Sequence, residues 1–225
     1  MAGKIDATVR LASFDYRAIY KEPMIRAWSQ RSGEIGQALY AAFSNWGVSL
    51  DHVSEAQGPG SLRQAGLFFQ LFQGKFVFRV GVGEAGLFAW NPDWSDSETI
   101  TNIVNSALEV LRAGAQLEFA GQEVTLEMHL SPAGTTVGEL TRGFLPSRLG
   151  SIGGAELRAC GFSLHTSDRL WQVDLSAIFP ESVFVKILLK FPETAAFGEI
   201  KERVHAEETK ALNLLALRIP GFEGS

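Results

Sequence analysis

Cysteine is almost absent from this sequence. Cys160 is the only one among 225 residues, so no disulfide can form within the chain and a reducing compartment is expected. The first ten residues lack the apolar core of a secretory signal, and the sequence contains no Asn-x-Ser/Thr acceptor site. Together these absences predict a cytoplasmic protein.

Long apolar runs and an excess of basic residues are missing as well. No run approaches the roughly 18 apolar residues that a membrane-spanning helix needs, so no membrane partner is expected. The 20 Lys and Arg residues are outnumbered by 25 Asp and Glu residues, which gives a net charge of −5. Nucleic-acid-binding proteins usually carry a clustered basic face, whereas these basic residues are scattered, so no nucleic-acid partner is expected.

Apolar residues are plentiful, and residues 65–90 hold their densest concentration. The stretch is nearly free of charge and predicts three antiparallel strands, joined by tight turns at 73–74 and 83–84. One face of such a meander needs helices or a second sheet over it. Because Phe68 and Phe72 are also apolar, the first strand of the meander is predicted to be central and covered on both sides.

The segment before the meander predicts one strand and one helix. Alternation over residues 4–14 is typical of a half-buried strand, and residues 15–22 are predicted to be a polar connection. Apolar residues then recur at helical spacing from Met24 to Trp46. Gly47 is expected to end this helix.

Capping-box patterns mark the start of two further helices. Ser95 with Glu98 precedes a clean apolar stripe, which Gly114 is expected to close. Thr136 with Glu139 precedes a shorter helical segment. Both patterns predict that a side chain satisfies the first free N–H groups of the helix.

The order of elements repeats along the chain. A strand at 123–131, a short helix, a second meander at 157–191 and a long helix at 194–217 follow the order of the first half. We therefore predict two repeat units, residues 1–116 and 117–225, in one compact domain. The predicted fold is α+β, an internal duplication of a strand–helix–antiparallel meander–helix unit. It forms one curved, mostly antiparallel sheet with helices on one face, which removes two exposed strand edges.

In the order of its elements, this arrangement resembles the duplicated saddle of the TATA-binding-protein class, or a helix-grip domain. The resemblance covers the chain and involves no shared motif. It therefore implies a fold and no function.

Two patterns suggest chemistry but have simpler structural explanations. Residues 81–86 match G-x-G-x-x-G, yet a dinucleotide site needs a helix to begin there, and the sequence predicts a strand. A hairpin turn is the better interpretation. His165 and Ser167 could form a nucleophile pair beside Asp168, but the turn-forming tendency of Ser and Asp explains these residues without catalysis.

The remaining reactive residues also lack a second partner. His129 and His205 are predicted to be surface residues, and no histidine has another ligand at metal-binding spacing. Cys160 is expected to behave as a small buried apolar residue. We therefore predict no catalytic residue, no metal site and no cofactor.

One loop carries more aromatic residues than a connection needs. Trp90, Asn91, Asp93 and Trp94 follow the first meander directly, and exposed aromatic residues on a loop can mark a binding site. We predict these four residues as the candidate binding site. The same tryptophans could alternatively fold back over the end of the sheet.

Two classes of function are compatible with these patterns. The first is a non-enzymatic cytosolic binding or assembly module that engages a protein partner, with a homo-oligomer possible. The second is a small-molecule-binding or hydrolytic domain with an apolar pocket between sheet and helices. A cavity of about 300 Å³ or more would favour the second class.

Overall fold

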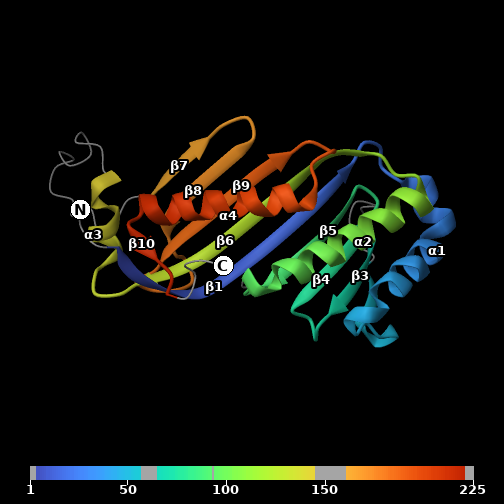
Figure 1. The fold of residues 1–225 in the computed structure, drawn as a ribbon, viewed down its shortest axis with the longest axis horizontal. Coiled ribbons are helices and arrows are strands. Elements are labelled where there is room, and N and C mark those ends of the chain that lie inside the picture. The colour runs from blue at the N-terminus through green and yellow to red at the C-terminus, as the bar shows by residue number, and fades with distance from the viewer. Residues whose placement is uncertain (1–3, 57–64, 93, 145–160, 221–225) are drawn as a thin grey trace. The chain divides into compact units, whose positions relative to one another are not determined.

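The computed structural model describes residues 4–56, 65–92, 94–144 and 161–220. Within these residues the chain is an α+β protein with ten strands in one mostly antiparallel sheet and four α-helices (Figure 1). The predicted α+β class and the antiparallel sheet are confirmed.

The elements follow one another in the order that alternation and helical spacing predict. Those of the first half are β1 (Ile5–Tyr20), α1 (Ile25–Phe43), β2 (Val53–Ala56), β3 (Gly66–Leu71), β4 (Phe76–Gly81), β5 (Glu84–Trp90) and α2 (Ser97–Ala115). Those of the second half are β6 (Phe119–Pro132), α3 (Val137–Thr141), β7 (Phe162–His165), β8 (Arg169–Leu175), β9 (Val183–Phe191), α4 (Phe197–Leu214) and β10 (Leu217–Arg218). The strand order is β2-β3-β4-β5-β1-β6-β9-β8-β7, and β10 pairs with β1.

The chain packs as two compact units. Unit 1 comprises Met1–Ala12, Thr125–Leu189 and Arg203–Ser225, and unit 2 comprises Ser13–Val124 and Lys190–Glu202. The division falls within β1, β6, β9 and α4, so each of these elements has residues in both units.

Strand β1 is longer than predicted. The polar connection expected at 15–22 is wrong, because β1 continues to Tyr20 and pairs with β5 along this length. The buried positions of β1 change from odd to even numbers between Ala7 and Ala12. After this change the tyrosines of the segment face the core, and the charged residues between them lie on the other face.

The core of unit 2 is a row of side chains that crosses four strands. Phe69, Phe78, Leu87 and Tyr16 are direct neighbours in the pairing of β3, β4, β5 and β1, and none of them is exposed. Phe43 of α1 packs edge-on against this row, with ring centroids 5.4 Å from Phe69 and 5.2 Å from Phe78. Helices α1 and α2 lie side by side over the same face (Figure 1). The predicted apolar stripe of α2 is fully buried, which confirms it.

Three predicted details of unit 2 are wrong. Helix α2 begins at Ser97 and not at a Ser95 capping box, and its N-cap residue Asp96 forms an ion pair with Lys75 at 2.6 Å. The residue that leaves the helix in the left-handed conformation is Gln116 and not Gly114. Strand β3 is central, between β2 and β4, as predicted, but the expected cover on its second side is wrong, because Phe68 is only half-buried and Phe72 lies exposed in the turn after the strand.

A buried hydrogen-bond network ties β1 to the chain entering α4. The Tyr16 hydroxyl donates to Gln122 Oε1 at 2.6 Å, and burial holds the pKa of Tyr16 far above its usual range. The Gln122 amide donates to the carbonyl oxygens of Pro192 at 3.2 Å and Ala195 at 2.9 Å. Because every polar atom of Gln122 has a partner, its burial is compatible with the apolar core.

Unit 1 follows the predicted pattern with one change. The alternate residues of β9 from Val183 to Leu189, its part in unit 1, are buried, and the Thr136–Glu139 capping box of α3 is present as predicted. Trp171 is buried, but the face predicted to continue along β8 ends early, because the strand stops at Leu175 and that side chain is 50% exposed.

Candidate functional site

The strand alternation of unit 2 places a second set of apolar side chains opposite the helices. Val77 and Phe88 are neighbours in the pairing of β4 and β5, and Phe68 lies on the same side of β3. Trp90 is 49% exposed, and its ring lies nearly perpendicular to that of Phe88 with centroids 4.6 Å apart. We call Phe68, Val77, Phe88 and Trp90 the aromatic face.

The predicted binding residues that the structure describes lie where the chain leaves β5. Trp90 is the last residue of β5, held there because its N–H donates to the Lys75 carbonyl at 3.1 Å. Asn91 adopts a left-handed φ of 43° and turns the chain out of the strand. Asp93 lies outside the described residues, and Trp94 begins a short 3₁₀ turn. The grouping of all four residues therefore stays a prediction.

Phe88 is the residue that the sequence-based prediction missed. It contacts Trp90 because residues two apart in a strand share a face. The alternation of Ala85, Leu87 and Ala89 into the core could have revealed this, since it assigns Phe88 to the opposite face.

A charged network borders the aromatic face. Arg17 bonds Glu123 at 2.8 Å, and Arg79 contacts Glu84 at 3.0 Å and Asp15 at 3.4 Å. Lys190 adds a third cation, 3.8 Å from Glu123. The three cations and three carboxylates balance, so this rim suits a polar contact surface better than an anion or cation site.

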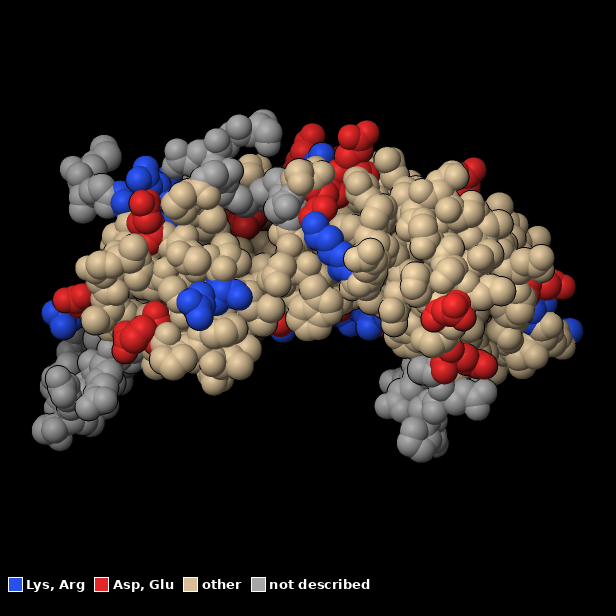
Figure 2. Space-filling model, turned by 90° about the horizontal axis from the view of Figure 1, so that it is seen from below, with Lys and Arg blue, Asp and Glu red and all other residues tan. Residues whose placement is uncertain are grey.

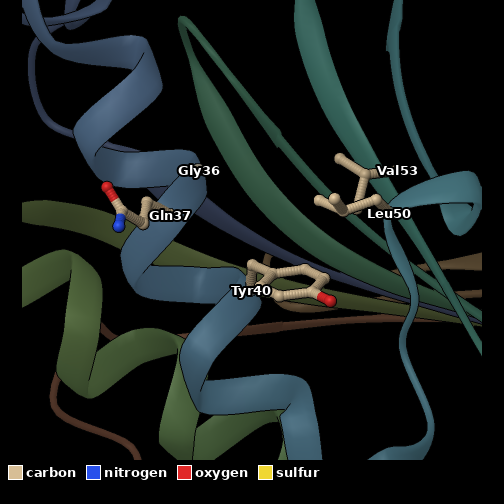
Figure 3. A pocket seen from close by; sticks show the side chains of 5 residues that line it. All are labelled: Gly36, Gln37, Tyr40, Leu50 and Val53. Atoms are coloured by element: carbon tan, nitrogen blue, oxygen red, sulfur yellow. The ribbon is translucent and has the colours of Figure 1, made fainter.

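A pocket of about 440 Å³ lies in unit 2 between α1 and β2. It is lined by Gly36, Gln37, Tyr40, Leu50 and Val53. Figure 3 shows the Tyr40 ring directed toward Leu50 and Val53, which point back toward α1. Its lining offers one hydroxyl and one amide and no charged group, so it supplies no acid or base.

His129 is buried, so its prediction as a surface residue is wrong. Only 8% of it is exposed, because Phe179 and Phe184 cover the ring with centroids at 5.5 and 5.0 Å. Its Nδ1 lies 2.9 Å from Ser176 Oγ. The two residues are 47 positions apart, so no local spacing could have indicated this contact.

The Ser176–His129 pair does not have the arrangement of a nucleophile and its base. The Ser176 oxygen already accepts the N–H groups of Ile178 at 3.2 Å and Phe179 at 2.9 Å. These bonds close the turn that follows β8 and leave no free lone pair for attack on a substrate. The pair is therefore a structural contact in the present conformation.

The other candidate chemistry is accounted for by turns. His165 and Ser167 are exposed, and no hydrogen bond joins them within the described chain. Asp168 binds Arg203 of α4 and the Thr166 hydroxyl, which lower its pKa to about 2. Residues 81–86 lie where β4 turns into β5, which confirms the hairpin interpretation of the G-x-G-x-x-G pattern.

The described residues contain neither a metal-binding group nor a membrane-spanning helix. Across residues 4–56, 65–92, 94–144 and 161–220, no group of three His, Cys, Asp or Glu residues could hold a metal ion. None of the described helices combines the length and the apolar character needed to cross a bilayer. Cys160 lies outside the described residues.

Comparison with known proteins adds no family. No family model matches the sequence, and no curated protein matches it.

Proposed function

We propose that this chain is a non-enzymatic cytosolic binding or assembly module that engages a protein partner through its aromatic face. The observation that carries the proposal is Trp90, half exposed at the end of β5 and packed against Phe88. Tryptophan is enriched among the residues that dominate the energetics of protein interfaces. A patch of aromatic side chains bordered by a polar rim has the composition of such an interface.

The charge distribution supports a protein over a nucleic acid as the partner. The charged network beside the aromatic face balances its own charges. Figure 2 shows one face of the molecule, on which Lys and Arg side chains stand singly among uncharged and acidic residues. A polyanion would find no basic cluster among the described residues on that face.

Substitution of Trp90 tests the proposal. We expect Trp90→Ser to weaken partner binding at least tenfold, because loss of an interface tryptophan typically costs about 2 kcal/mol or more. The measurement is quantitative capture from a lysate of the source cells by the immobilised full chain. Sedimentation of the purified protein shows whether the partner is a second copy.

The exposed Leu50, which lines the pocket and lies outside the aromatic face, provides a matched control. We expect Leu50→Ser to keep the capture, and both variants to keep the melting temperature of the unmodified protein. Capture that is insensitive to Trp90→Ser, or lost with Leu50→Ser, would contradict the proposal.

We also propose that residues 1–116 and 117–225 are duplicated units. The strand order supports this, since β5-β4-β3 follows β1 on one side as β9-β8-β7 follows β6 on the other. Each half also places a helix between its first strand and its meander, and a helix after it. The repeat units proposed differ from the two packing units, which divide β1, β6, β9 and α4.

The pocket between α1 and β2 favours a second candidate function, the binding of a small apolar molecule. Its volume of about 440 Å³ is within the range of ligand sites. In a thermal-shift screen of small apolar compounds, we expect a ligand at 100 times its dissociation constant to stabilise the fold by about 2.7 kcal/mol.

Filling the pocket provides the control for this screen. Leu50→Trp should abolish the ligand-induced shift, whereas Leu214→Trp, at another exposed leucine, should leave it unchanged. A shift that survives Leu50→Trp would place the ligand elsewhere and rule out the pocket.

A further inference from the structure

Residues 176–182 form a hairpin loop between β8 and β9 that is held closed from β6. Ser176 N–H donates to the Ser182 carbonyl at 2.9 Å, and the Ser176 oxygen accepts the Ile178 and Phe179 N–H groups. From β6, Ser131 Oγ bonds Ser182 Oγ at 2.7 Å and His129 Nδ1 bonds Ser176 Oγ at 2.9 Å. The loop is thus closed by serine hydroxyls and one imidazole.

The hydrogen-bond pattern selects one protonation state of His129. Two backbone N–H groups occupy both lone pairs of the Ser176 oxygen, so its own proton must point to His129 Nδ1. Nδ1 can accept that proton only if it carries none, which requires the neutral imidazole. A protonated His129 would set a ring N–H against the hydroxyl proton and break the bond.

The charged groups around His129 do not remove this constraint. On β6 itself Glu127 favours the charged imidazole, but Lys186 of β9 bonds Glu127 at 2.8 Å. From β1, Arg10 lies 5.6 Å from the centroid of Phe179, which covers His129. Within the loop the charged residue is Glu181, which is exposed. Burial lowers the pKa of His129, and the nearby Glu127 carboxylate only partly offsets this effect.

We propose that His129 is an acid-sensitive latch that releases the 176–182 hairpin when its imidazole is protonated. Histidine is the side chain suited to respond between about pH 5 and 8. Ile178 at the tip of the hairpin is 61% exposed, and Leu175 at the base of the hairpin is 50% exposed. Release would therefore allow an exposed apolar segment to move away from β6. The latch is independent of the aromatic face, which belongs to unit 2, whereas His129 and the hairpin belong to unit 1.

The direction of the pH response follows from linkage. In the closed hairpin, the pKa of His129 is lower than the value of about 6.5 expected when the hairpin is open. The open state therefore binds more protons in this window, and closure is fully stable above about pH 6.5 and weakens as the pH falls through the closed-state pKa. Each pH unit that separates the two pKa values corresponds to a tenfold change in the opening equilibrium.

Residue-resolved hydrogen exchange on the full chain tests the latch. When the pH is lowered from 7.5 to 5, the opening constants of the Ile178 and Phe179 amides, corrected for intrinsic exchange, should rise. The rise should be up to tenfold for each pH unit between the closed-state and open-state pKa values of His129. The opening constant of the Ile103 amide in α2 should not change. In H129Q, whose amide does not take up a proton in this pH range, the rise should disappear. In H165Q, at an exposed histidine of the same unit, it should persist.

Three results would overturn the latch. They are a flat opening constant in the unmodified protein, a rise that persists in H129Q, and an equal rise at Ile103. If H129Q does not fold, an NMR titration of the unmodified protein decides, and a His129 pKa at or above about 6.5 would rule the latch out.

Discussion

Replacement of Trp171 by alanine is expected to cost about 3–5 kcal/mol of the free energy of unfolding, through lost transfer energy and the cavity left behind. Trp171 is 8% exposed, lies beside Ile187 in the pairing of β8 and β9, and is stacked by the Arg169 guanidinium at 5.2 Å. Such a loss is a large share of the roughly 5–15 kcal/mol that stabilises a domain. Denaturant melts of the variant measure it.

Trp171→Phe separates packing from hydrogen bonding. The Trp171 indole N–H is buried and has no hydrogen-bond partner in the part of the chain that the structure describes. Phenylalanine keeps an aromatic ring and removes this unsatisfied donor, so its cost should be much smaller than that of alanine.

The exposed tryptophan of β5 serves as the control for this series. Trp90→Ala should change the free energy of unfolding by no more than about 0.5 kcal/mol, as exposed positions usually do. We also expect Trp94→Ala to leave the melting temperature nearly unchanged. Equal losses at Trp171 and either of these residues would show that the core assignment is wrong.

The second large effect is expected at Gly86 in the middle of β5. A Cβ at this position would collide with the Tyr16 carbonyl oxygen and lie 3.3 Å from Arg79 Nε. The carbonyl belongs to a paired strand and cannot move aside without breaking the ladder. Gly86→Ala should therefore cost about 1–3 kcal/mol or more, as overpacking of a tight site does.

Gly83, in the turn before β5, provides the matched control. No atom lies within 4 Å of a Cβ placed there, so Gly83→Ala should stay within about 0.5 kcal/mol of the unmodified protein. Denaturant midpoints of the two variants compare the same substitution three residues apart. A stable Gly86→Ala variant would mean that β1 and β5 are less tightly packed than described.

Side-chain periodicity predicted most elements of this fold. The stripe of α2, the alternation of β9 and the meander of β3–β5 each have a regular period, and the sequence alone identifies them. Periodicity failed for β1, because its buried positions change phase near Ala12 and its charged residues suggested a loop. It also failed for the start of α2, where an ion pair with Lys75 replaces the expected cap.

The candidate site was less accessible to sequence reasoning. Trp90 could be proposed from its position at the end of an apolar stretch, and the alternation of β5 could also have indicated its contact with Phe88, although the prediction did not include that residue. The contacts of His129 could not be predicted at all. They join β6 to a loop 47 residues away, and no local pattern encodes such a pairing.

Photo-crosslinking from the aromatic face is the most direct test of the proposed function. A photoreactive phenylalanine derivative placed at position 90 of the full chain should crosslink a protein partner in cells. The same photoreactive residue at position 50, in the lining of the pocket, should not crosslink a partner. Efficient crosslinks at position 50 with none at position 90 would contradict the account, because the contact surface would then lie at the pocket between α1 and β2.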